Sequence, residues 1–156
     1  MKETYYDSAK EHIKERYQTD WLGRYHGLRE QYSENGTVLM RGHYKHNIPH
    51  GVFEHYRENG DLMSRETLED GKLEGRSEHY SKGHLDTVYT YHQGIKEGPF
   101  EEYWNAGTLM KKGIYHDNLQ EGLTKNIGKM VLCGKKICIV QIKKKALPAN
   151  ILRTER

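Results

Sequence analysis

The residues best suited to chemistry are glutamates and tyrosines that recur at a fixed spacing along the 156-residue chain. Glutamates stand at positions 30, 54, 78 and 101, and a tyrosine follows each of them two residues later. Residues two apart in a β-strand share one face of a sheet, so both types would line a single surface. Acid–base catalysis needs carboxylates in unlike environments, whereas repetition makes these alike. We therefore expect either a surface that binds a basic or polar ligand or a half-solvated sheet face.

Ten histidines invite a metal or catalytic interpretation. His55 and His79 occupy the same slot of consecutive units, so we expect them side by side along the sheet. A zinc site needs three or four converging ligands, and no predicted patch holds more than two. The sequence contains no nucleophile elbow and no phosphate-binding loop. We expect no metal, no cofactor and no catalytic residues, hence a protein that is not an enzyme.

These residues belong to an internal repeat that spans most of the chain. Glycines open five units at positions 27, 51, 75, 98 and 122, at intervals of 23 or 24 residues. Self-similarity at a fixed period of this size is the mark of a repeat architecture. Each unit contains two short stretches of β-prone residues, separated by turn-forming residues such as Gly36 and Gly60.

Pairs of residues that tolerate a positive φ separate one unit from the next. They are His46-Asn47, Asp70-Gly71, Gln93-Gly94 and Asp117-Asn118, and we predict a hairpin turn at each. Because every connection is short, neighbouring strands should be antiparallel. The product is an elongated, twisted, single-layer sheet of about five β-hairpins.

Strand alternation predicts which residues share a face. We expect one stripe to contain Tyr32, Val38, Tyr44, Tyr56, Leu62, Leu68, Tyr80, Leu85, Tyr91, Tyr103, Leu109 and Tyr115. The repeated glutamates should lie on the same face, where a column of acids would repel unless basic residues lie diagonal to it. Arg41, His43, Arg65 and Lys112 are expected on the opposite face.

The two ends of the chain depart from the repeat. In residues 1–18 the apolar residues Tyr6, Ala9, Ile13 and Tyr17 have helical spacing, so we predict a helical cap there. Residues 19–134 hold the hairpin repeats, and residues 135–156 hold a terminal strand and a basic tail with Lys143, Lys144 and Lys145. The strand at residues 136–142 is expected to end the sheet.

The recurring core G-x-x-x-x-Y-x-x-x-G-x-L resembles the variant MORN repeat, in the form found in bacterial and phage YwqK-type antitoxin-like proteins. The resemblance covers residues 23–134. It implies an all-β repeat protein, built as a curved single-layer antiparallel sheet of MORN-like hairpins, that serves as a protein-binding or scaffolding surface. The antitoxin-like form implies that the partner is a toxic enzyme. The sequence departs from the pattern at Ile127, which replaces the fifth tyrosine.

We therefore expect a non-enzymatic protein-binding module that neutralises a toxin or a host-defence protein of a phage or bacterial system through a Tyr-rich face. The residues expected to bind the partner are Tyr32, Glu54, His55, Tyr56, Glu78, His79, Tyr80, Tyr91, Tyr103 and Tyr115. One alternative is a sponge for a small, nucleotide-type ligand. Another is an adaptor for nucleic acid or a membrane surface that uses the basic tail.

Charge and hydropathy restrict these alternatives. The net charge of +3 divides into +8 from Thr124 onward and −5 before it. A net-acidic repeat region opposes a phosphate backbone, so only the tail favours nucleic acid. Without an apolar segment long enough to cross a bilayer, we expect a cytoplasmic protein. Open sheet edges make a homo-oligomer a further expectation.

Overall fold

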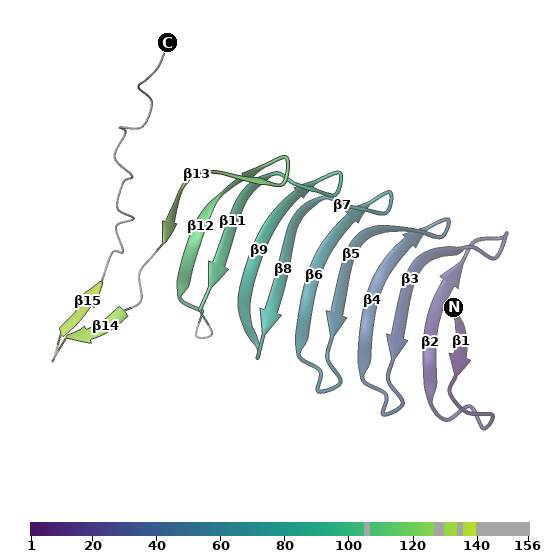
Figure 1. The fold of residues 1–156 in the computed structure, drawn as a ribbon. Helices are drawn as coiled ribbons and strands as arrows, with labels where there is room; N and C mark the ends of the chain where they lie inside the picture. The colour runs from purple at the N-terminus through teal and green to yellow at the C-terminus, as the bar shows by residue number, and fades with distance from the viewer. Residues whose placement is uncertain (105–106, 127–129, 134–135, 140–156) are drawn as a thin grey trace, which may run out of the picture.

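The computed structural model describes residues 1–104, 107–126, 130–133 and 136–139, with side chains as far as residue 121. One antiparallel sheet runs through most of the chain, and its strands lie side by side in sequence order (Figure 1). They are β1 (Lys2–Tyr5), β2 (Ile13–Thr19), β3 (Tyr25–Tyr32), β4 (Val38–Lys45), β5 (Ile48–Tyr56), β6 (Leu62–Glu69), β7 (Lys72–Leu73), β8 (Gly75–Ser81), β9 (His84–His92), β10 (Ile95–Lys96), β11 (Gly98–Tyr103), β12 (Leu109–His116) and β13 (Leu119–Asn126). The predicted all-β hairpin repeat is confirmed.

Tight turns form one edge of this sheet. Both residues of His46-Asn47, Asp70-Gly71, Gln93-Gly94 and Asp117-Asn118 have positive φ, as the predicted two-residue hairpin turns require. Each of two turns donates a hydrogen bond to the strand before the two that it connects. The Asn47 N–H donates to the Tyr25 carbonyl on β3 at 2.9 Å, and the Gly71 N–H donates to the Pro49 carbonyl on β5 at 2.9 Å. Successive hairpins are thus joined at this tight-turn edge as well as along their strands.

The predicted N-terminal helix is wrong. Residues 2–5 and 13–19 form β1 and β2, which pair with each other, and β2 pairs with β3. Tyr6 and Ala9 lie in the connecting loop, where the Asp7 carboxylate accepts hydrogen bonds from the His12 and Glu11 N–H groups. Strand pairing with the repeat therefore outweighs a four-residue apolar stripe that had no partner helix to pack against.

Strand register sorts the side chains onto two faces. Directly paired residues share a face, and one row of pairs crosses the whole sheet: Glu3, Arg16, Glu30, Arg41, Glu54, Arg65, Glu78, Val88, Glu101 and Lys112. We call this side the Glu–Arg face. The other side, the aromatic face, carries Tyr17, Tyr25, Tyr44, Phe53, Tyr89, Tyr91, Phe100 and Tyr115.

The predicted single tyrosine stripe is therefore wrong for four of its twelve members. A β-bulge shifts the register near the start of the returning strand of each hairpin. In β5–β6, His55 pairs with Ser64 and Tyr56 pairs with Leu62, so Met63 is an extra residue on β6. The extra residue reverses the alternation for the rest of the returning strand. Tyr44, Leu68, Tyr91 and Tyr115 consequently lie on the aromatic face, while Arg41, Arg65 and Lys112 join the glutamates.

Burial is concentrated on the aromatic face, as suits a sheet that forms a single layer within the described residues. Phe53, Phe100 and Met40 are buried there by their own neighbours, and Val88 is buried on the Glu–Arg face. The Phe53 ring lies over Gly42, its direct partner on β4, and occupies the space that a Cβ at Gly42 would need. The glycine thus lets a large ring pack flat on the sheet.

The chain beyond β13 does not extend the long sheet within the described residues. β14 (Met130–Cys133) and β15 (Lys136–Ile139) pair only with each other. The prediction that the strand at residues 136–142 ends the sheet is therefore wrong, although a strand is present. Lys143, Lys144 and Lys145 lie outside the described residues. In the part of the chain that is described, no helix has the length and apolarity needed to cross a bilayer.

Candidate functional site

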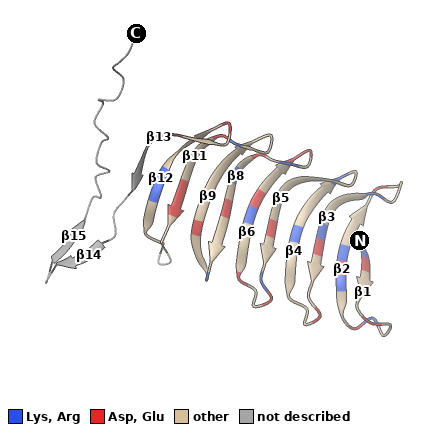
Figure 2. Cartoon of the chain, in the orientation of Figure 1, with Lys and Arg blue, Asp and Glu red and all other residues tan. Residues whose placement is uncertain are grey.

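Opposite charges alternate along the central row of the Glu–Arg face. Figure 2 shows acidic and basic bands on successive strands from β1 to β6. Arg16 Nε donates to Glu3 at 2.9 Å, Arg41 Nε to Glu30 at 2.9 Å, and Arg65 Nε to Glu54 at 3.0 Å. Cross-strand pairs of opposite charge stabilise a sheet, whereas a column of acids would weaken it. The repulsion expected from the repeated glutamates is therefore removed by arginines directly beside them.

Each glutamate of the row also accepts a hydrogen bond from the tyrosine two residues later. The hydroxyls of Tyr5, Tyr32, Tyr56, Tyr80 and Tyr103 donate to Glu3, Glu30, Glu54, Glu78 and Glu101 over 2.6–2.9 Å. The prediction that these glutamates and tyrosines share a face is confirmed. The first pair was missed because residues 1–18 were interpreted as helix.

The charged groups of this row are not equally accessible. The side chains of Glu30, Glu54 and Glu78 are only 9–17% exposed, whereas those of Arg41, Arg65 and Arg76 are 47–58% exposed. The carboxylates thus lie low against the sheet, with their oxygens occupied by arginine and tyrosine donors. The accessible charge is that of the guanidinium groups, although the row is close to neutral in formal charge.

The alternation is interrupted on β9, where the buried Val88 pairs with both Glu78 and Glu101. Arg76, two residues before Glu78 on β8, compensates: its Nε donates to Glu78 at 2.8 Å. Burial raises the pKa of Glu78, but hydrogen bonds from Arg76 and Tyr80 outweigh it and leave that pKa lowered. Burial and the hydrogen bond to Glu78 raise the pKa of Tyr80. Glu78 is therefore ionised and Tyr80 neutral near pH 7, a stable pairing with no proton to exchange.

Exposed aliphatic side chains flank the row on the same face. Val52 pairs with Thr67 next to the Glu54–Arg65 pair, Met63 lies two residues before Arg65, and Ile114 lies two residues after Lys112. All three are 40–55% exposed. The spacing of the repeat glycines and tyrosines did not predict these exposed aliphatic side chains. The arginines could have been found from a basic residue eleven positions after Glu30, Glu54 and Glu101.

His55 and His79 lie on the aromatic face, away from Glu54 and Tyr56, because they alternate with them. Ser64 of β6 stands between the two histidines in the register. The predicted partner-binding set is therefore split. Tyr32, Glu54, Tyr56, Glu78, Tyr80 and Tyr103 share the Glu–Arg face, whereas His55, His79, Tyr91 and Tyr115 lie on the other.

One serine, histidine and glutamate come together on the aromatic face but do not form a triad. The Ser77 hydroxyl is 3.4 Å from His79 Nε2, and Glu66 Oε1 is 3.8 Å from that same nitrogen. A triad needs the acid and the nucleophile on different ring nitrogens. Ser77 is also 1% exposed, so no substrate could reach it. Among the described residues, no group of three or more His, Cys, Asp or Glu converges as metal ligands would.

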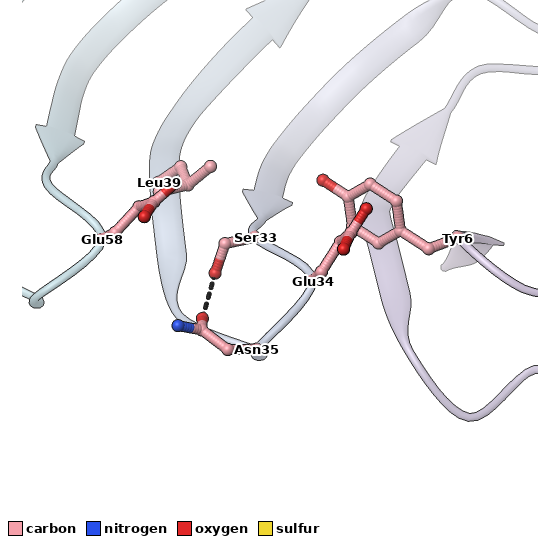
Figure 3. A pocket seen from close by; sticks show the side chains of 6 residues that line it. All are labelled: Tyr6, Ser33, Glu34, Asn35, Leu39 and Glu58. Atoms are coloured by element: carbon pink, nitrogen blue, oxygen red, sulfur yellow. Dashed lines mark hydrogen bonds between the residues drawn. The ribbon is translucent and has the colours of Figure 1, made fainter.

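An open hollow of about 400 Å³ lies at the edge opposite the tight turns, between the first loops of the sheet (Figure 3). Its lining residues are Tyr6, Ser33, Glu34, Asn35, Leu39 and Glu58. The Tyr6 hydroxyl donates to the Tyr32 carbonyl at 2.7 Å, which ties the N-terminal loop to the first repeat. The hollow is open to solvent and its two carboxylates, Glu34 and Glu58, are exposed, so it does not enclose a ligand.

Comparison with known families identifies the repeat. The MORN repeat variant matches residues 25–46, 49–70 and 96–117. These segments correspond to the hairpins β3–β4, β5–β6 and β11–β12, and each ends in a tight turn. The hairpin β8–β9 has a two-residue turn, Lys82-Gly83, in place of the longer one of its neighbours. No curated protein matches the chain. The chain therefore contains three MORN repeat variants, which lie in one continuous sheet.

Proposed function

We propose that this protein is a non-enzymatic binding module that docks a partner protein on its Glu–Arg face. The observation that supports this most directly is the combination of half-exposed arginines with exposed Val52, Met63 and Ile114 on one side of the sheet. Arginine, methionine and tyrosine are enriched in protein interfaces. The face is also held in place by its ion pairs, so binding would order few further side chains.

The proposed binding residues follow from the register rather than from the tyrosine spacing. Arg41, Arg65, Tyr56, Tyr80 and Met63 lie together on the Glu–Arg face, and Tyr91 and Tyr115 drop out because they lie on the other side. The tyrosine hydroxyls are already bonded to glutamates. Their rings, rather than their hydroxyls, are thus the groups offered to a partner.

The biological role that we propose is neutralisation of a toxin or a host-defence protein. It is supported by the resemblance of the repeat to the YwqK-type antitoxin-like form. A long, preorganised sheet face is suited to covering a partner's active surface without any chemistry of its own.

Affinity capture from the native host tests this assignment. Met63→Glu and Ile114→Glu replace an apolar side chain with a negative charge at exposed positions of the Glu–Arg face. Trp21→Glu is the matched control, because Trp21 is 89% exposed in the turn between β2 and β3, away from the row. We expect a partner that binds the unaltered protein and Trp21→Glu but is lost from the other two.

The same variants then test the biological role. A toxin that binds in this way should be inhibited by the unaltered protein and by Trp21→Glu but not by Met63→Glu. If every captured protein binds Met63→Glu and Ile114→Glu as tightly as the unaltered chain, the Glu–Arg face is not the docking surface.

A further inference from the structure

We infer that the Glu–Arg face selects a partner protein segment rich in aspartate and glutamate, whose carboxylates bind the outer sides of Arg41, Arg65 and Arg76. This inference rests on the proposed function and names the chemistry of its partner. It differs from both expectations from the glutamate column, which were a surface for a basic or polar ligand and a half-solvated sheet face.

The first argument is the number of donors left free. A guanidinium has five N–H donors in a planar fork that suits a carboxylate. Within the described residues, Arg41 uses its Nε on Glu30, and Arg76 uses its Nε on Glu78. Arg65 uses Nε and Nη2 on Glu54, while its Nη1 stays 3.9 Å from Glu78. Terminal N–H groups on all three arginines therefore remain available to a second carboxylate.

The second argument is the depth of the two charges. Glu30, Glu54 and Glu78 are each bonded to an arginine and a tyrosine, and the arginine is the more exposed partner, so an approaching molecule meets the guanidinium first. The carboxylates of an acidic partner would lie nearer to the guanidinium than to the glutamate beneath it. Because Coulomb energies fall with distance, attraction to the guanidinium outweighs repulsion from the glutamate. A basic side chain would meet the arginines as like charges, which costs binding energy.

The third argument concerns the arrangement of the arginines. Arg41 and Arg65 stand two strands apart in one row, which corresponds to about 10 Å. Arg76 lies on the next strand, one step to the side. A segment with several carboxylates can thus engage more than one guanidinium at once, which favours an acidic stretch over a single acidic residue.

The apolar neighbours of the arginines favour a protein segment over nucleic acid. Val52 and Met63 flank the arginines and offer contacts that a peptide's aliphatic side chains can satisfy.

The test uses the full chain and two synthetic peptides, one composed of Glu and Val and the other of Lys and Val. Binding is followed through the NMR signals of the arginine Nε–H groups. We expect the Glu–Val peptide to shift the signals of Arg41, Arg65 and Arg76, and the Lys–Val peptide to leave them unchanged. Arg65→Gln should weaken Glu–Val binding about 1.5- to 5-fold, as for an exposed charge pair, and added salt should weaken it further.

Lys82→Asn is the matched control, since it removes one exposed positive charge from a turn outside the row and asparagine tolerates the positive φ found there. It should leave Glu–Val affinity unchanged. Arg65→Lys keeps the charge in case Arg65→Gln unfolds, and should still lose affinity because an ammonium lacks the planar fork.

Three outcomes would overturn the inference: equal binding of both peptides, shifts confined to other arginines, or tighter binding of a single-stranded oligonucleotide of equal charge. The proposed function is tested separately. If Met63→Glu abolishes capture of the natural partner while Arg65→Gln and added salt do not weaken it, the acidic character of the partner is disproved but the docking face is not.

Discussion

Arg65 binds the Glu54 carboxylate from the neighbouring strand, with Nε at 3.0 Å and Nη2 at 2.9 Å from the same oxygen, Oε1. The Tyr56 hydroxyl donates to the other oxygen at 2.9 Å. Burial raises the pKa of Glu54, but the hydrogen bonds from Tyr56 and Arg65 outweigh it, so the pKa is lowered overall. Its stabilising contribution is thus present above the ordinary value of 4.5 and is lost as the pH falls through the lowered pKa.

Arg65→Gln should therefore lower the free energy of unfolding at pH 7 by about 0.5–1 kcal/mol, because the pair is only partly buried. Glu54→Gln should have a similar effect, and the double variant should lose less than the sum of the two. Urea unfolding of all four proteins measures the coupling. A coupling energy of zero would mean that the ion pair does not stabilise the sheet.

Gly42→Ala should destabilise the protein by about 1–3 kcal/mol through overpacking, because its Cβ would occupy the position of the Phe53 ring. Gly42 does not have a positive φ, so the effect is steric and not a matter of backbone strain. Phe53→Leu in the same chain should recover part of the loss, and thermal unfolding compares the variants. If Gly42→Ala costs as much in a chain that carries Phe53→Leu as in one that keeps Phe53, the ring is not the cause.

Asn47→Ala should lower the free energy of unfolding by about 1–2 kcal/mol, because alanine disfavours the φ of 72° found there. The Asn47 side-chain oxygen also accepts from the Tyr25 N–H at 2.7 Å. Asn47→Gly keeps the backbone conformation and should cost less. At the equivalent position, Gly71 faces Pro49, which has no N–H to satisfy. Equal losses for both Asn47 variants, measured by urea unfolding, would show that φ is unimportant here.

His92 should titrate above its ordinary value of 6.5, because its ring is bonded to Glu74, with Nδ1 at 3.0 Å from Oε1. Glu97 and Glu69 also raise the pKa of His92. A raised pKa means that the stabilisation is fully present below pH 6.5 and is lost as the pH rises through the folded value. Glu74→Gln should therefore lower the pKa of His92, and an NMR titration of the variant measures the change.

His116 is the internal control for that titration. Its pKa is raised by a hydrogen bond to Glu97, with Nδ1 at 2.8 Å from Oε1, and by the charge of Glu97. It should therefore stay raised in Glu74→Gln and fall only in Glu97→Gln. A parallel drop of both histidines in Glu74→Gln would point to a change of the whole tight-turn edge instead of one pair.

The features that could be predicted from sequence are those decided by neighbours in the chain. A positive φ is a property of single residues, so Asp70-Gly71 and Asp117-Asn118 indicate their turns directly. The two-residue offset of Glu54 and Tyr56 likewise places both on one face. The bulge opposite Tyr56 could not be predicted, because it depends on how two strands pair and not on either strand alone.

The secondary structure of the N-terminal segment also depends on strand pairing, which the segment's own sequence does not reveal. Tyr6, Ala9, Ile13 and Tyr17 fit a helix when they are considered alone. Arg16, however, pairs with Glu3 on one side and Glu30 on the other, and this pairing exists only once the sheet has formed. The energy of cross-strand pairing therefore decided the secondary structure.

The sequence by itself determined the repeat, its period, the tight turns and the sharing of one face by the glutamates and tyrosines, since these follow from local backbone preference and strand alternation. Only the tertiary structure decided that arginines complete the row, that the glutamates lie beneath them and that Tyr91 and Tyr115 lie on the other side. Those features depend on register between strands, which bulges shift by one residue and so reverse the face of every residue that follows.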